Sequence, residues 1–154
     1  MPDMLRKQFV REIIVQGNLH DVFACFCPVA ERQWAPGWQC VMVYSQSGVA
    51  EKNCVFTTRH SPLPTMVWVC SIYDVDQEVE YVRVTPEHFV TSINILTTPI
   101  DNATRCIVTY THTALSPGGA AFIEHHFTPE QFAADIDAWP AQIAAYLEHR
   151  ANHG

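Results

Sequence analysis

Basic residues are scarce in this chain. Nine lysines and arginines stand against 16 aspartates and glutamates, so the formal net charge is −7. Binding to nucleic-acid phosphates needs a basic surface, and so does electrostatic docking on anionic lipid. The charge balance therefore argues against a nucleic-acid partner and leaves small neutral or cationic partners open.

Long apolar runs are also missing. Nowhere do 18 uncharged apolar residues follow one another, and no basic segment followed by an apolar run opens the chain. We therefore expect a cytoplasmic protein without a membrane span. A chain of 154 residues with 48% hydrophobic content can bury a core without metal or disulfide support, and we expect one domain, residues 1–154.

The motifs of several enzyme classes are absent. No phosphate loop, GxGxxG, HExxH or GxSxG occurs, which argues against nucleotide-dependent and serine-hydrolase chemistry. The run Glu124-His125-His126 suggests a metal site, but neighbouring residues on a helix point about 100° apart and no other carboxylate completes a set. His149 and His153 are spaced for a metal but lie in a tail expected to fray. We expect neither a metal nor a cofactor.

The cysteines form neither a CxxC pair nor a compact secreted framework. Most lie in apolar runs, where a free thiol behaves as a small hydrophobe, and we expect reduced core thiols, with disulfides or metal ligation as the alternative. The six are Cys25, Cys27, Cys40, Cys54, Cys70 and Cys106.

One segment near the C-terminus, residues 128–149, has a clear helical period. Thr128 followed by Pro129 and Gln131 fits a capping box, and Phe127 and Phe132 are placed to form a hydrophobic staple. A helix of this length spans roughly 33 Å, enough to cross a whole sheet. Its apolar stripe consists of Phe132, Ile136, Trp139, Ile143, Tyr146 and Leu147, and its outer side of Ala134, Asp137, Ala141, Ala145 and Glu148.

Pro140 interrupts this helical pattern. A proline inside a helix removes the hydrogen bond to the carbonyl of Ile136 and bends the axis. The sequence leaves two possibilities open: one bent helix, or two abutting helices.

Most of the remaining chain alternates in a way that predicts strands. β-Branched and aromatic runs are separated by turn signals, and short turns favour antiparallel pairing. Ser116-Pro117-Gly118-Gly119 is expected to break the sheet, and a short amphipathic piece, 120–126, leads into the long helix. The predicted strands are 8–16, 38–44, 54–59, 65–73, 78–85, 88–98 and 104–114, and short helices over 20–27 and 28–32 follow the first of them.

The order of these predicted strands and helices favours an α+β fold, in which the long helix packs its apolar stripe on one face of the sheet. It resembles the helix-grip architecture of the birch-pollen-allergen and START-like (SRPBCC) superfamily, a curved antiparallel sheet of about seven strands around a long C-terminal helix. Local segments are similar to the bacterial branch grouped with polyketide cyclases and activators of a heat-shock chaperone ATPase. These segments are Val22-Phe23, 31–38, 67–69 with Tyr73-Asp74, 80–86 and 108–116, and the resemblance covers essentially the whole chain.

The resemblance implies an internal cavity between the concave sheet face and the C-terminal helix. The sequence agrees in one respect, because it carries more bulky aromatic surface than a two-layer domain of this size requires. Plain core packing is the alternative explanation for each ring. The residues expected to contact a ligand include Trp34, Trp38, Trp68, Phe132, Ile136, Trp139 and Ile143.

Strand alternation selects the polar candidates. On 104–114, Cys106, Val108, Tyr110 and His112 share one face, which we expect to point inward, opposite a ladder of threonines. On 78–85, Tyr81 and Arg83 share a face whose direction the pattern leaves open.

If Tyr81 and Arg83 point inward, four side chains could serve both binding and chemistry. Arg83 could fix an acidic or enolate-like group, Tyr81 or Tyr110 could donate a hydrogen bond, and His112 could act as general acid or base. The alternative is a solvated Arg83 and a structural His112. His60, in a proline-rich loop, is expected at the cavity mouth and exposed.

Three functions follow as hypotheses. The first is binding of a small hydrophobic molecule, a lipid for example, in the cavity by a monomer or homodimer. The second is a polyketide cyclase or dehydratase-like enzyme that uses the same cavity, and the third is a chaperone-activating interaction module that uses an exterior surface.

Overall fold

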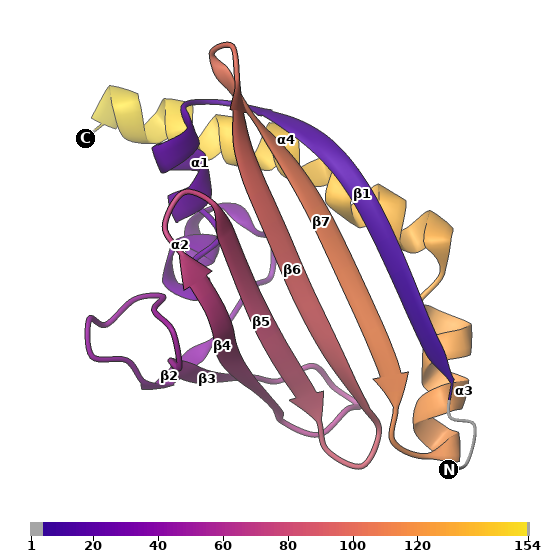
Figure 1. Ribbon diagram of the computed structural model, residues 1–154. Helices are drawn as coiled ribbons and strands as arrows, with labels where there is room; N and C mark the ends of the chain where they lie inside the picture. Colours follow the sequence, from indigo (N-terminus) through magenta and orange to yellow (C-terminus); the bar gives the residue numbers. More distant parts are fainter. Residues whose placement is uncertain (1–4, 154) are drawn as a thin grey trace.

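A seven-stranded antiparallel sheet forms the centre of the protein (Figure 1), as seen in a computed structural model that describes residues 5–153. The sheet order is β1-β7-β6-β5-β4-β3-β2, so β2 to β7 form a meander and β1 completes the sheet by pairing with β7. This confirms the α+β helix-grip architecture. The strands are β1 Arg6–Gln16, β2 Val41–Tyr44, β3 Val55–Thr58, β4 Met66–Asp74, β5 Glu78–Thr85, β6 Phe89–Ile100 and β7 Ala103–Ala114.

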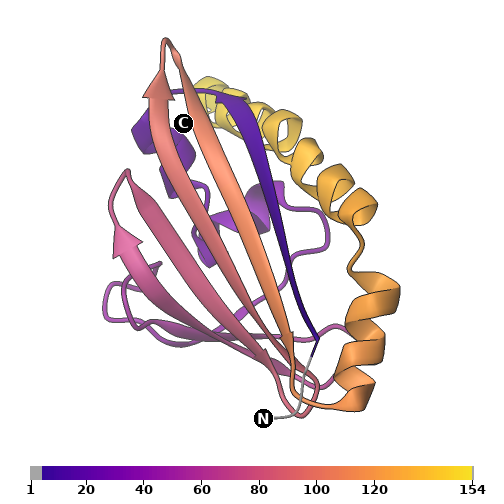
Figure 2. The same ribbon diagram turned by 45° about the vertical axis from the view of Figure 1, so that its right-hand side comes forward.

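Four helices gather on one side of the sheet. Figure 2 shows the longest helix, α4, lying across the concave side of the sheet, with α2 between α4 and the sheet. Helix α3 lies at the end of the molecule away from the C-terminus. Helix α4 packs against β1 and α2. The helices are α1 Leu19–Ala24, α2 Pro28–Trp34, α3 Pro117–His126 and α4 Pro129–His153.

Two register shifts interrupt the ladders of the meander. One lies between Cys70 and Ile72 in β4 and the other between Met42 and Tyr44 in β2. A bulge bends its strand and increases the local twist. These two shifts therefore help the sheet to curve toward α4.

Helix α4 follows its predicted pattern closely. Phe132, Ile136 and Ile143 are buried, and all five residues of the predicted outer side are exposed. The Thr128 hydroxyl accepts a hydrogen bond from the Gln131 backbone N–H at 3.2 Å, as the capping box requires. The Gln131 side chain donates to Asp135 instead, which leaves the box half formed. The helix runs unbroken through Pro140, so the alternative of two abutting helices is wrong.

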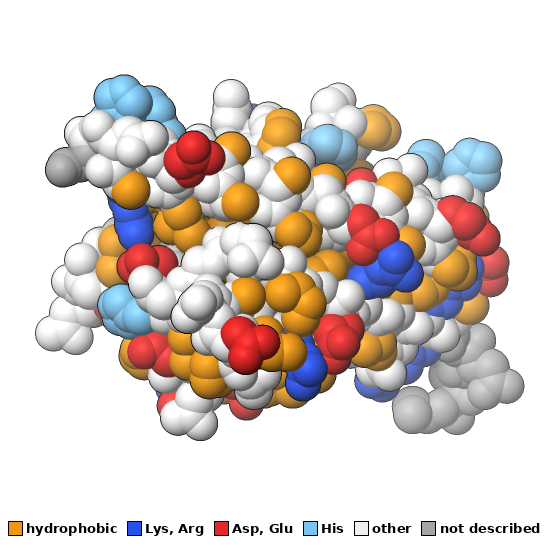
Figure 3. All heavy atoms as spheres, turned by 90° about the horizontal axis from the view of Figure 1, so that it is seen from above, with side chains coloured by type: hydrophobic (Ala, Val, Ile, Leu, Met, Phe, Trp, Pro, Cys, Tyr) orange, Lys and Arg blue, Asp and Glu red, His pale blue; other side chains and the backbone are white. Residues whose placement is uncertain are grey.

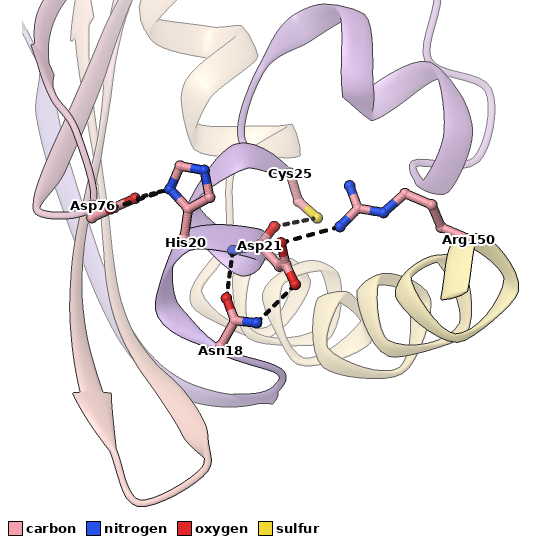
Figure 4. Close-up of polar contacts among 6 residues, drawn as sticks. All are labelled: Asn18, His20, Asp21, Cys25, Asp76 and Arg150. Atoms are coloured by element: carbon pink, nitrogen blue, oxygen red, sulfur yellow. Dashed lines mark hydrogen bonds and ion pairs between the residues drawn. The ribbon is translucent and has the colours of Figure 1, made fainter. Parts of the chain in front are cut away.

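Polar contacts fasten α1 to its surroundings (Figure 4). The Asn18 side chain caps the helix by accepting from the Asp21 backbone N–H at 2.9 Å. Nδ1 of His20 lies 3.0 Å from Asp76 in the β4–β5 turn, and Asp21 lies 3.2 Å from Arg150 near the end of α4. These contacts hold α1 between the sheet and the C-terminal helix.

Several boundaries differ from the sequence prediction, and the tail around His149 and His153, which was expected to fray, is the helical end of α4. Three further differences concern β2, α3 and α2. Strand β2 begins at Val41 and not at residue 38, because Trp38 donates its indole N–H to the Pro28 carbonyl and belongs to the interior. The predicted breaker Ser116-Pro117-Gly118-Gly119 is the start of α3, and the Ser116 hydroxyl caps it by accepting from the Gly119 N–H at 3.0 Å. The predicted second helix extends to Trp34.

The core comprises one large cluster between the sheet and α2 and α4, and a small one under α3 around Phe89 and Ile123. All six cysteines are free thiols and five are buried. Seen from above (Figure 3), charged side chains are interspersed with apolar ones, as on a solvated surface. Within residues 5–153, no helix has the length and apolar character needed to cross a bilayer.

Candidate functional site

Two adjoining pockets open on the concave side, near the junction of α3 and α4. The larger has a volume of about 350 Å³ and the smaller about 160 Å³. Arg83, His126 and Phe127 line both pockets. Arg83 on β5 therefore stands at the boundary between them.

The face of β5 that the sequence left open is now defined. Val79 and Tyr81 are almost completely buried and Arg83 lines both pockets, so this set points inward. On β7 the expected inward residues Cys106, Val108 and His112 are buried as well.

Aromatic rings form one wall of the larger pocket. The Trp68 ring stacks on Phe56 with 5.2 Å between centroids, and Trp38 meets Trp68 edge to face at 5.5 Å. The Trp68 indole N–H donates to the Thr58 hydroxyl at 2.8 Å, which fixes the ring. The wall is therefore a rigid apolar surface. Met66 and Leu63 extend it, and the exposed His60 lies at its rim as expected.

The smaller pocket lies between β7 and the first turns of α4. Tyr110 meets the Phe132 ring edge to face at 5.1 Å, and Phe9 of β1 stacks on Phe132 at 5.5 Å. Ile136 and His112 complete this predicted set. Five of the expected ligand contacts thus meet here: Arg83, Tyr110, His112, Phe132 and Ile136.

Arg83 is held by weak contacts only. Its guanidinium carbon lies 5.2 Å from the centre of the Trp68 ring, and Nη2 donates to the Thr91 hydroxyl at 3.3 Å. Nε is buried without a hydrogen-bond partner. Burial lowers the pKa of Arg83 from its ordinary value because the charged form is poorly solvated.

His112 is the most enclosed polar group of the site. Its Nδ1 lies 2.8 Å from the Thr91 hydroxyl, and Phe127 stacks on the ring at 4.1 Å between centroids. Burial, aided by the Arg83 charge, lowers the pKa of His112 to about 3. Since Arg83 donates to Thr91, the threonine hydroxyl is free to donate to Nδ1. This arrangement favours the neutral tautomer that carries its proton on Nε2.

Tyr81 and Tyr110 differ in whether their hydroxyl groups are available to a ligand. The Tyr81 hydroxyl donates a hydrogen bond to the Phe26 carbonyl at 2.6 Å. This hydroxyl is therefore buried in the core and already has a partner. Tyr110 lines the smaller pocket. Burial raises the pKa of Tyr110, and the nearby Arg83 charge opposes part of this shift. Tyr110 therefore remains a neutral hydrogen-bond donor.

The other expected ligand contacts lie away from both pockets. Trp34 donates its N–H to the Cys25 carbonyl at 2.8 Å and meets Trp139 edge to face at 5.9 Å. Trp139 also packs on Phe26 at 5.7 Å, and Ile143 is fully buried. Trp34, Tyr81 and Ile143 are buried and Trp139 is half-buried, so these residues pack together next to the two pockets. Trp34 also lines a separate surface pocket, together with Gln33 and Tyr146.

Three side chains of the site were not predicted as ligand contacts: Thr91, which contacts Arg83 and His112, and His126 and Phe127, which line both pockets. Thr91 follows Phe89 on the inward face of β6, so a lone threonine in an apolar alternation was the available signal. Glu31 lies three residues after the buried Pro28 and three before the buried Trp34 on α2. Burial raises the pKa of Glu31 to about 8, so this carboxyl is largely protonated at neutral pH.

Three of the buried cysteines are poor candidates for nucleophiles. Burial raises the pKa values of Cys25, Cys70 and Cys106 to about 12, which makes these thiols poor nucleophiles. Across residues 5–153, no three His, Cys, Asp or Glu side chains converge on a common point where a metal ion could bind.

Comparison with models of known protein families gives no match, and neither does comparison with curated protein sequences. Solved structures match in fold. A hypothetical protein from Helicobacter pylori has a TM-score of 0.71 at 13% identity over 91% of this chain and 87% of that one. Norcoclaurine synthase from Thalictrum flavum, in complex with dopamine and hydroxybenzaldehyde, gives 0.63 at 12% identity over 95% and 88%.

A third match is DynU16, a protein in the dynemicin biosynthetic locus. Its TM-score is 0.57 at 12% identity, over 92% of this chain and 47% of DynU16. At these identities the likeness concerns the fold alone. Sheet order, helix placement and these matches show that the chain has a helix-grip fold.

Proposed function

We propose that the protein binds a small, mainly hydrophobic molecule in the two pockets joined by Arg83. The observation that carries the proposal is the rigid aromatic lining. Trp38 and Trp68 bound the larger pocket and Phe9 and Phe132 the smaller one. Largely preformed apolar pockets of this size, with a few polar groups, are typical of small-molecule sites. The norcoclaurine synthase structure, which contains two small aromatic molecules, supports the same use of the fold.

Calorimetric titration with naphthylacetamide, a neutral aromatic probe, tests this proposal. Leu63→Trp fills space in the larger pocket and should weaken binding about tenfold or more. Val67→Trp is the matched control, because Val67 lies four residues after Leu63 on β4, is exposed and lines neither pocket. Equal binding by the two variants, or no binding by the wild type at about 1 mM, would contradict the proposal. Native mass spectrometry of the purified protein should also detect a co-purified small molecule.

The second candidate is a cyclase or dehydratase-like enzyme in the same pockets. It is favoured by the chain of contacts from Arg83 through Thr91 to His112. A guanidinium and a neutral imidazole N–H are donors that can stabilise an enolate oxygen. An enzyme of this kind should accelerate deuterium exchange at the carbon next to the carbonyl of β-tetralone, followed by NMR. Arg83→Gln and His112→Gln should each slow exchange about tenfold or more, and a wild-type rate equal to that of buffer argues against this candidate.

The interaction-module alternative requires exposed apolar surface away from the pockets. Val41, Val43 and Tyr44 of β2, an edge strand, are each more than 60% exposed. If this surface binds another protein, Val43→Glu should abolish the interaction and leave probe binding unchanged. A partner complex that tolerates Val43→Glu would exclude β2 as its site.

A further inference from the structure

The charge around the larger pocket is opposite to that of the whole protein. The chain carries a net charge of −7 with histidines counted as neutral, yet Arg59 and Arg83 line the larger pocket and no aspartate or glutamate does. From this contrast we infer that the ligand is an amphipathic anion, an apolar aromatic body with one carboxylate, and that Arg83 binds the carboxylate. This inference rests on the proposed function, because it specifies the class of molecule that the pockets accept.

Arg83 lacks the counter-ion that a half-buried guanidinium normally has. Among residues 5–153, no carboxylate lies within ion-pair distance of it. Its Nη2 makes one long hydrogen bond to a neutral hydroxyl, and its Nε makes none. Taking a charge out of water is costly unless an opposite charge compensates it. A ligand carboxylate would supply that compensation.

The position of the guanidinium also suits a carboxylate. The Trp68 ring occupies one face of the guanidinium, at 5.2 Å. The N–H donors of an arginine lie in its plane, where two of them match the two oxygens of a carboxylate. Stacking on Trp68 therefore orients Arg83 without using these donors.

The remaining lining defines the rest of the ligand. Trp38, Trp68, Leu63, Met66 and Phe122 are apolar or aromatic and surround the larger pocket. They offer an amine no carboxylate in the larger pocket, where, besides the arginines and histidines, the uncharged Gln39 and Thr58 are the polar lining residues, and Asp135 lines only the smaller pocket. Arg59 at the exposed rim attracts an anion from solution. A hydrophobic cation in the larger pocket would lie beside the uncompensated charge of Arg83, which repels it.

Calorimetry of the full chain with three matched probes tests the inference: naphthylacetic acid, naphthylacetamide and naphthylethylamine. The acid should bind wild type about tenfold to a hundredfold more tightly than the amide, and the amine should bind most weakly. Arg83→Gln should remove the preference for the acid, so that this variant binds acid and amide with about equal affinity. Arg83→Lys, which keeps the charge but not the planar fork, should keep part of the preference.

Arg105→Gln is the matched control, since Arg105 lies on β7 of the same sheet, pairs with Glu12 and lines neither pocket. It should leave all three affinities unchanged. If wild type binds acid and amide equally, the inference is overturned and the proposed function stands. If Arg83→Gln retains the full preference for the acid, Arg83 is not the carboxylate site. If none of the probes binds, the proposed function itself fails.

Discussion

Nδ1 of His112 and the hydroxyl oxygen of Thr91 lie 2.8 Å apart on the inner face of the sheet, and both side chains are buried. Phe127 stacks on the imidazole and keeps water from that face of the ring. A proton on His112 would be poorly solvated and would lie near the positive charge of Arg83. The folded protein therefore holds this histidine neutral.

Burial of His112 makes the protein less stable at acid pH. The unfolded chain takes up a proton at His112 near pH 6.5, whereas the folded chain does so only near pH 3. Folding free energy is therefore lost as the pH falls below 6.5 toward 3. His112→Gln removes this loss, so the variant should gain about 2 kcal/mol relative to wild type between about pH 7 and pH 4.5. Urea unfolding of both proteins measures the change, and a difference independent of pH would mean that His112 titrates normally when folded.

Glu31 leads to a prediction of opposite pH dependence. Its pKa is raised from 4.5 to about 8 by burial, so the folded state holds a proton that the unfolded state has released at neutral pH. This costs stability progressively as pH rises from 4.5 to 8. Glu31→Gln should raise the free energy of unfolding by about 1 kcal/mol at about pH 8, a value reduced for the partial exposure of the side chain, and by nothing at about pH 4.

The control for this prediction is the same substitution at Glu51. Hydrogen bonds from the Ser47 hydroxyl and from the backbone N–H groups of Ser47 and Gln46 lower the pKa of Glu51 to about 2. Glu51→Gln should therefore destabilise the protein at about pH 8. A gain in stability from both substitutions would point to net charge and not to burial of Glu31.

The sequence was sufficient for most of the fold. The alternation in β5 and β7 and the stripe of α4 are local patterns with one dominant period, and the structure keeps them. The start of α3 was missed because Ser116-Pro117-Gly118-Gly119 has the composition of a turn. That segment is helical because Ser116 caps it, Pro117 fits a first helical position, and Gly119 packs against the backbone of His88.

The candidate site was predicted only in part, because it depends on how distant segments meet. The expected aromatics divide into those that line pockets, such as Trp68, and those that pack together, such as Trp34 with Trp139. In the sequence, an aromatic residue that lines a pocket and one that packs in the core occur in the same pattern of apolar residues. The contact of Arg83 with Thr91 and His112 joins β5, β6 and β7, and only the register of these strands reveals it.

Trp139 provides a test of this division. It packs on Phe26 and Trp34 and lines neither pocket, so it belongs to the packed core. Trp139→Ala should lower the free energy of unfolding by about 3 kcal/mol through the void that it leaves, whereas Trp139→Phe should lower it by less. Chemical denaturation measures both. A loss below about 1 kcal/mol for the alanine variant would place Trp139 at open cavity or solvent.

Two adjacent glycines at the start of α3, Gly118 and Gly119, have different surroundings. A Cβ on Gly119 would lie 1.7 Å from the His88 carbonyl oxygen, which is backbone and accepts a hydrogen bond from the Leu115 N–H. A Cβ on Gly118 would meet only the Ser116 hydroxyl, at 3.9 Å. Gly119→Ala must therefore separate α3 from the β5–β6 turn and should cost about 3 kcal/mol or more, while Gly118→Ala should be neutral or stabilise the helix by about 0.5 kcal/mol. Because the pockets lie at the α3–α4 junction, Gly119→Ala should also weaken naphthylacetamide binding. Thermal unfolding and calorimetry of both variants test this, and equal stabilities would mean that α3 does not pack on His88 in solution.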